Sequence, residues 1–180
     1  MNLIENKIAV EYLRVAKMNF SSIKQYADKS IAQLNEDQMH LPTIGENNSI
    51  AIIMQHISGN LKSRFTDFLT SDGEKPNRNR DGEFEDTKKS KETLVSEWEN
   101  SWSILFQLLE TISIEDFCTK TVYVRSEAHT VLEAINRQVW HYSFHVGQIV
   151  SIAKQIKGND WKNLSIPKGD SGKFNNEKMK

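Results

Sequence analysis

The stretch TVLEAINRQVWHYSFHVGQIVSIAKQIKG, residues 130–158, decides the fold class of this chain. Its apolar side chains recur every three or four residues, which is the period of an α-helix that buries one face. Thr130 and Glu133 have the spacing of a capping box, and Gly158 is typical of a helix end. The sequence therefore predicts a long amphipathic helix that starts near Thr130 and ends near Gly158.

Three further segments have the same helical spacing, at about 3–34, 49–69 and 87–112. Glycine and proline cluster between these segments rather than within them. The one candidate strand is short and lies near 120–125, where it either pairs with residues near Ile44 or stays extended. Four long amphipathic helices with so little strand predict an all-α fold, a four-helix bundle.

The length of 180 residues fits a single domain. We assign the bundle to residues 1–162 and a polar, mobile C-terminal tail to residues 163–180. The stretch SDGEKPNRNRDGEFED, residues 71–86, combines Gly, Pro, Asn and dense charge and is expected to form a long surface loop. Its arginines Arg78 and Arg80 are either merely solvated or bind an anionic group of a substrate.

The composition limits the classes of partner. The chain has 23 Lys and Arg against 24 Asp and Glu, so its charge does not favour nucleic acid or an anionic membrane. No apolar run approaches the roughly 20 residues that span a bilayer, and the N-terminus lacks a signal-peptide pattern. The single cysteine, Cys118, cannot form an internal disulfide and is expected to be a small buried hydrophobe. We expect a cytoplasmic protein that acts on a small molecule.

Histidines provide the main functional clue. His141 and His145 are four residues apart and therefore lie on one face of their predicted helix, and His56 borders the apolar face of the helix at 49–69. A cleft between the two helices could hold all three imidazoles, a set that binds a divalent transition metal and leaves positions open for water or substrate. Asn60 and Gln148 lie on the same helix faces and could hydrogen-bond to a metal-bound water or to a ligating ring.

Structural interpretations compete with this one. A buried histidine is more often a hydrogen-bonded core residue than a ligand, and the HxxxH spacing also arises by chance. Tyr142 stands where the zincin motif requires a glutamate, which disfavours the common metalloprotease mechanism. His40 lies in an expected turn and His129 just precedes a helix cap, so both are expected to be exposed or locally hydrogen-bonded.

Three stretches together resemble one known family. They are HISGNLKSRFTDFL (56–69), DGEKPNRNRDGEF (72–84) and TVLEAINRQVWHYSFHVGQIVSIAK (130–154), and they resemble the DinB/YfiT-like superfamily, specifically its DUF1572 branch. The resemblance implies a four-helix bundle with a long crossover, which often forms homodimers. It also implies a divalent metal, typically nickel or zinc, held by the positions that are His56, His141 and His145 in this chain. Characterised relatives include transferases that add a low-molecular-weight thiol to electrophiles.

Two classes of function follow. The leading hypothesis is a metal-dependent enzyme that activates a thiol or water for attack on a small electrophile, either a thiol S-transferase or a small-molecule hydrolase. In it Gln148 and Asn60 orient the nucleophile or the substrate. The alternative is a non-catalytic metal-binding or stress-response dimeric module, which a fourth protein ligand such as His40 or Asp67 would favour. A third interpretation is that the histidines pack without a metal.

Overall fold

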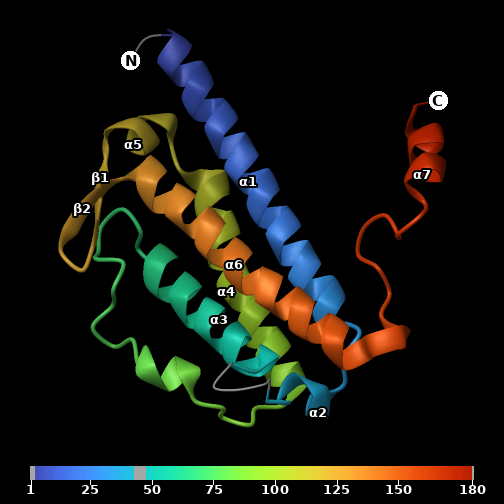
Figure 1. The fold of residues 1–180 in the computed structure, drawn as a ribbon. Coiled ribbons are helices and arrows are strands. Elements are labelled where there is room, and N and C mark those ends of the chain that lie inside the picture. Colours follow the sequence, from blue (N-terminus) through green and yellow to red (C-terminus); the bar gives the residue numbers. More distant parts are fainter. Residues whose placement is uncertain (1–2, 43–47, 180) are drawn as a thin grey trace.

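The computed structural model describes residues 3–42 and 48–179 (Figure 1). The fold is all-α with one small two-stranded sheet, as the sequence predicts. The elements in chain order are α1 (Leu3–Ile31), α2 (Glu36–Met39), α3 (Ile50–Phe65), the 3₁₀ helix η1 (Asp81–Phe84), α4 (Lys91–Thr111), α5 (Ile114–Thr119), β1 (Thr121–Val124), β2 (Glu127–Thr130), α6 (Val131–Lys157), the 3₁₀ helix η2 (Gly158–Asp160) and α7 (Ser171–Lys178).

The long helices α1, α3, α4 and α6 lie side by side and bury their apolar faces against one another (Figure 1). α1 packs mainly on α6, and α3 packs mainly on α4. Aromatic rings join these pairs, because the ring of Trp102 in α4 lies 5.5 Å from that of Tyr142 in α6 and 6.3 Å from that of Phe20 in α1. Such fully buried rings contribute several kcal/mol of hydrophobic stabilisation, on the order of 1.5–3 kcal/mol each. They fix α6 rigidly in the bundle.

The connection between α3 and α4 is the long crossover that the resemblance implied. α3 and α4 run in the same direction, so residues 66–90 must return along the bundle before α4 can begin (Figure 1). The returning chain carries η1, which packs against α3. The segment 71–86 therefore does more than connect two helices, because it forms one wall beside α3.

Buried hydrogen bonds attach this crossover to the bundle. The hydroxyl of Ser63 in α3 donates to the carbonyl oxygen of Gly73 at 2.7 Å and accepts from the backbone N–H of Lys75 at 3.1 Å. The N–H of Gly73 in turn donates to the carbonyl oxygen of Tyr123 in β1 at 2.8 Å. The start of the crossover is thus held by both α3 and the hairpin.

Helix ends agree with the sequence within a few residues. The capping box predicted for α6 is present, with Thr130 and Glu133 each bonded to the other's backbone. α3 ends earlier than predicted, at Phe65 rather than Leu69, because Thr66 is extended and Asp67 has a positive φ of 48°. A left-handed residue cannot continue a right-handed helix.

The hairpin corrects one expectation. The predicted strand forms as β1, but it pairs antiparallel with β2, which the sequence did not reveal; Ile44, one of its expected partners, lies outside the described residues. The turn residues Arg125 and Ser126 both have positive φ, 54° and 63°. Asn-Gly is the usual sequence for such a turn. Here the carboxylate of Asp72 accepts hydrogen bonds from the backbone N–H groups of both turn residues, at 2.9 and 2.8 Å. These bonds stabilise a turn that the dipeptide Arg-Ser does not predict.

One smaller expectation was wrong. Cys118 is exposed on α5 rather than buried, and α5 itself was not predicted. The tail contains α7, all of whose residues are exposed and which stands away from the bundle (Figure 1). The division into 1–162 and 163–180 stays a prediction, as does the homodimer.

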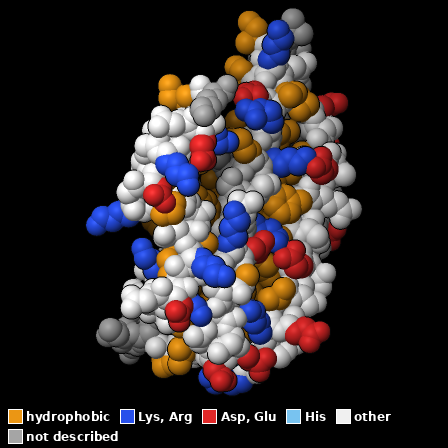
Figure 2. All heavy atoms as spheres, turned by 90° about the vertical axis from the view of Figure 1, so that its right-hand side faces the viewer, with side chains coloured by type: hydrophobic (Ala, Val, Ile, Leu, Met, Phe, Trp, Pro, Cys, Tyr) orange, Lys and Arg blue, Asp and Glu red, His pale blue; other side chains and the backbone are white. Residues whose placement is uncertain are grey.

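The surface toward the right-hand side of Figure 1 carries both signs of charge. Figure 2 shows Lys and Arg interspersed there with Asp and Glu and with hydrophobic side chains. In the part of the chain that the structure describes, none of the helices combines the length and apolar character that crossing a membrane requires.

Ser63→Ala tests the attachment of the crossover. The change leaves the Gly73 carbonyl and the Lys75 N–H without their buried partner, so we expect the free energy of unfolding to fall by about 1–3 kcal/mol. Urea unfolding followed by circular dichroism measures it. Ser103→Ala is the matched control, because the exposed Ser103 hydroxyl bonds only within α4 and its loss should cost less than about 0.5 kcal/mol. Equal stability of both variants and the wild type would contradict the proposed anchoring.

Candidate metal centre

Three histidines meet between α3 and α6. His56 extends from α3, and His141 and His145 extend from successive turns of α6. The Nε2 atoms of His141 and His145 are 3.2 Å apart, and one ring nitrogen from each of the three residues lies within 4.8 Å of the others. Two nitrogens that ligate one ion at about 2.1 Å lie roughly 3–4 Å apart. The structure therefore brings the three predicted ligands together, and we call them the three-histidine cluster.

Each ring of the cluster is held from behind by a side-chain oxygen at its Nδ1. His56 faces Glu83 Oε2 at 3.0 Å. His141 faces Gln138 Oε1 at 3.1 Å, and His145 faces Gln148 Oε1 at 3.2 Å. Ligating histidines commonly donate their second N–H to a carboxylate or carbonyl oxygen in this way, which fixes the tautomer and the direction of the ring.

The tautomer has a direct consequence for the cluster. An oxygen acceptor at Nδ1 requires the proton to be on Nδ1, so Nε2 of the same neutral ring carries a lone pair. The lone pairs of His141 and His145 then face each other across 3.2 Å, where neither nitrogen can donate to the other. A cation between them converts this repulsion into attraction. This donor set of neutral imidazoles fits a divalent metal such as nickel or zinc.

Burial favours the neutral form of the two rings on α6, those of His141 and His145. Burial, together with the charges of the neighbouring His145 and His56 and of nearby arginines, lowers the pKa of His141 to about 3. Burial also lowers the pKa of His145. Because a protonated imidazole cannot ligate, a lowered pKa leaves Nε2 free to bind a cation at ordinary pH.

Glu83 is the functional residue that the sequence analysis missed. It comes from η1 in the crossover, and Arg78 binds both of its carboxylate oxygens at 2.8 Å. Burial alone raises the pKa of Glu83, but the hydrogen bonds from Arg78 and His56 outweigh burial and lower it. The carboxylate stays ionised behind the His56 ring. The loop contains several acidic residues, and nothing in their order distinguishes Glu83, so only the crossover's path along α3 reveals it.

Gly59 explains how the carboxylate approaches α3 so closely. A Cβ at this position would lie 2.2 Å from Glu83 Oε1, far inside van der Waals contact. Only a glycine at this position leaves room for the Glu83 carboxylate against α3. Gly147 on α6, by contrast, has open space around it.

One side of the cluster opens to a pocket of about 240 Å³. Asn60, Phe84 and Trp140 contribute to its wall, and Trp140 is 50% exposed at the rim. The Phe84 ring also packs on His56, with 4.6 Å between the ring centroids. Among the residues that the structure describes, no other His, Cys, Asp or Glu joins the three histidines as a fourth ligand. The cluster thus faces a space that a small molecule can enter.

The remaining candidates occupy different positions. Asn60 lines the pocket, and its Oδ1 accepts a hydrogen bond of 2.9 Å from the buried Tyr142 hydroxyl. Gln148 contacts the back of the His145 ring instead. His40 is neither exposed nor locally hydrogen-bonded, because its ring bonds to distant residues, the carboxylate of Asp86 and the carbonyl oxygen of Lys89. His129 differs from expectation, since it lies in β2 with a buried Nε2 that has no hydrogen-bond partner among the described residues.

Comparisons with known proteins agree with the motifs. Neither the curated proteins nor the solved structures give a match. A protein-family model described as "Protein of unknown function (DUF1572)" matches residues 7–170, which include every element from α3 to α6 and therefore the whole three-histidine cluster. The wider resemblance to the DinB/YfiT-like superfamily stays a prediction. The match covers most of the chain, and this protein therefore belongs to the DUF1572 family.

Proposed function

We propose that the protein is a divalent-metal-dependent enzyme that acts on a small electrophile, with thiol S-transfer as its reaction class. The observation that carries this proposal is that one ring nitrogen from each of the three histidines lies within 4.8 Å of the others, beside a pocket with no fourth protein ligand among the described residues. A closed structural site would surround its metal with four protein ligands. Nickel or zinc suits the donor set, and His56, His141 and His145 would hold it.

The pocket wall favours a thiol over water as the nucleophile. Apart from the three histidines, its described lining contains arginines, amides and aromatic rings but no carboxylate, thiol or phenol. General acid–base catalysis of hydrolysis needs such a group within reach of the substrate. A divalent metal held by the three histidines would lower the pKa of a coordinating thiol, so that the thiol would ionise and release its proton to solvent without a base in the wall. Transfer of a thiol, such as a low-molecular-weight cellular thiol, therefore needs no acid or base group in the pocket wall, whereas hydrolysis does.

The chain's own residues have distinct roles in this proposal. Glu83, Gln138 and Gln148 hold the ligand rings in the tautomer that presents Nε2. Asn60, whose amide is oriented by Tyr142, offers Nδ2 as a donor toward a substrate in the pocket. Phe84 and Trp140 cover the pocket with apolar surface, which limits competition by water.

The same wall also supports a second candidate, a non-catalytic metal-binding or stress-response module. A pocket without acid or base groups other than histidine can bind a metal and a ligand and transform neither. The two candidates share the metal and differ in turnover. Measurements of turnover therefore distinguish the two candidate functions, and measurements of metal content do not.

Metal content tests the ligand set. Protein purified without a His-tag and loaded with nickel or zinc should bind about one ion per chain, and His141→Ala should lose this ion because two nitrogens hold it far more weakly than three. Elemental analysis after gel filtration measures the ratio. His40→Ala is the matched control, because its ring bonds to Asp86 and Lys89 away from the cluster. Unchanged metal content in His141→Ala would reject the ligand assignment.

Glu83→Gln tests the support behind His56. The amide keeps the shape of the side chain but removes the charge, so we expect metal affinity to fall about 10–100-fold while the fold is retained. Competition with a chromogenic chelator measures this affinity. Glu85→Gln in the same loop, where the side chain is exposed, should bind metal as the wild type does. Equal affinities for the two variants would show that the carboxylate does not support a ligand.

Turnover tests the reaction class. Metal-loaded protein should accelerate the loss of free thiol when low-molecular-weight thiols are paired with small electrophiles, and His141→Ala should reduce the rate to the uncatalysed level. A thiol-reactive dye follows the reaction. Full metal occupancy without turnover for any pair would favour the non-catalytic module.

A further inference from the structure

Arg64 presents an unsatisfied cation to the pocket. It lies on α3 and is 7% exposed, and its Nε and Nη1 have no hydrogen-bond partner among the described residues. Its remaining contact is a 3.3 Å ion pair from Nη2 to Glu74. Burying charged donors without acceptors is costly, so a folded protein retains such an arrangement where a bound group satisfies it.

Nearby carboxylates do not neutralise this cation. Glu74 is shared among three guanidiniums, with contacts of 3.2–3.3 Å to Arg64, Arg78 and Arg125. Two other carboxylates are nearby. Glu83 is already engaged by Arg78 and His56, and Asp72 accepts from the backbone N–H groups of Glu74, Arg125 and Ser126. Five arginines line the pocket against these three carboxylates, so the surplus charge is positive.

Arg137 adds to the surplus from the opposite helix. It is exposed on α6, lines the same pocket, and forms no ion pair within the described part of the chain. Burial lowers the pKa of Arg64, and while Glu74 opposes this change, the guanidiniums of Arg78, Arg137 and Arg125 lower it further. The part of this shift that comes from the three guanidiniums reflects repulsion between like charges. An anion between Arg64 and Arg137 would relieve that repulsion.

The two helices place these arginines at one end of the pocket. His56, Asn60 and Arg64 are spaced by four residues along α3, as are Arg137, His141 and His145 along α6, and each step of four advances about 6 Å. α3 and α6 run in opposite directions (Figure 1), so Arg64 and Arg137 meet at the end of the pocket away from His145. An anion there lies one to two helical turns, roughly 6–12 Å, from the three-histidine cluster.

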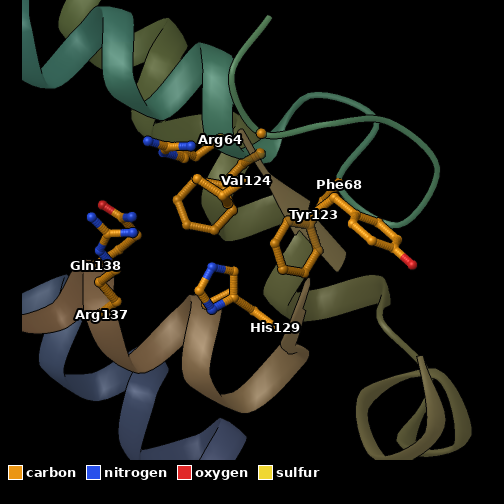
Figure 3. Close-up of a pocket in the computed structure, with 10 residues that line it drawn as sticks. Arg64, Phe68, Tyr123, Val124, His129, Arg137 and Gln138 are labelled. Carbon is orange, nitrogen blue, oxygen red and sulfur yellow. The ribbon is translucent and has the colours of Figure 1, made fainter. Parts of the chain in front are cut away.

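A small cavity adjoins this end and shares Arg64, Arg137 and Gln138 with the pocket. Figure 3 shows these three side chains along one side of the cavity, with the ring of His129 directed into it. Its volume of about 20 Å³ suits one water-sized group. His129 Nε2 is a second buried polar atom without a partner in the described residues. Unsatisfied groups thus collect at the arginine end.

The loop arginines expected to bind an anion are less suited to it. Arg78 is occupied by Glu83 in a two-bond contact and by Glu74. Arg80 lies over the ring of Phe84, 5.4 Å from its centroid. Their arrangement supports the η1 segment, and the unsatisfied donors belong to Arg64.

We propose that the pocket takes a small molecule with a carboxylate or phosphate group, which Arg64 and Arg137 bind, while the reacting end of the molecule lies at the three-histidine cluster. The second half of this statement rests on the proposed function. The first half, the anion site, stands on the arginines alone. The substrate class is therefore a small anionic thiol or electrophile rather than a neutral one.

Anion binding is measured on metal-free protein, so that the probe cannot bind a metal. Inorganic phosphate and acetate are titrated separately by calorimetry, and the tighter of the two identifies the anion as phosphate-like or carboxylate-like. Arg137→Gln and Arg64→Lys should each weaken the tighter probe by about tenfold, because each removes part of a charge-assisted, forked contact. Arg14→Gln is the matched control, since Arg14 is exposed on α1 and pairs with Glu11.

Several outcomes would overturn the inference. They are the absence of saturable binding of both probes, wild-type affinity in Arg137→Gln, and an equal loss in Arg14→Gln. Arg137 is exposed, so its variant remains informative even where Arg64→Lys does not fold. Retained anion binding in a wild type that binds no metal would reject the proposed function alone, whereas metal binding without arginine-dependent anion binding would reject this inference alone.

Discussion

The hydrogen bond between His56 Nδ1 and Glu83 Oε2 is the contact on which the rest of the site depends. It joins α3 to the η1 segment of the crossover across 27 positions of the sequence. Arg78 holds the carboxylate ionised, and Gly59 leaves room for it on α3. Without this support the ring of His56 could rotate, and its Nε2 would have no fixed direction toward α6.

The helices could be predicted from the sequence because each follows from local signals. A period near 3.6 and the pair Thr130 and Glu133 locate α6 within one or two residues. The same periodicity placed His141 and His145 on one face, since four residues make about one turn. Spacing within a single helix was therefore enough to predict that two of the three candidate ligands lie together.

Contacts between distant segments could not be predicted in this way. The turn at Arg125 and Ser126 depends on Asp72, which lies more than fifty residues earlier, so its own sequence gives no hairpin signal. Glu83 is one of several acidic residues in its loop, and its role follows from the path of the crossover. Arg64 is part of a stripe that is otherwise ordinary for a helix, and only its burial and its unsatisfied donors distinguish it.

The charges of the site explain why a thiol and an anionic group suit the same pocket. Three neutral imidazoles leave the charge of a bound divalent ion undiminished, and Glu83 offsets only part of it through His56. Arg64 and Arg137 extend the positive potential along the pocket. A positive environment lowers the pKa of a thiol by stabilising the thiolate, and it also attracts a carboxylate or phosphate. Both effects arise from one imbalance of charge between α3 and α6, so the proposed chemistry and the proposed substrate class require the same residues.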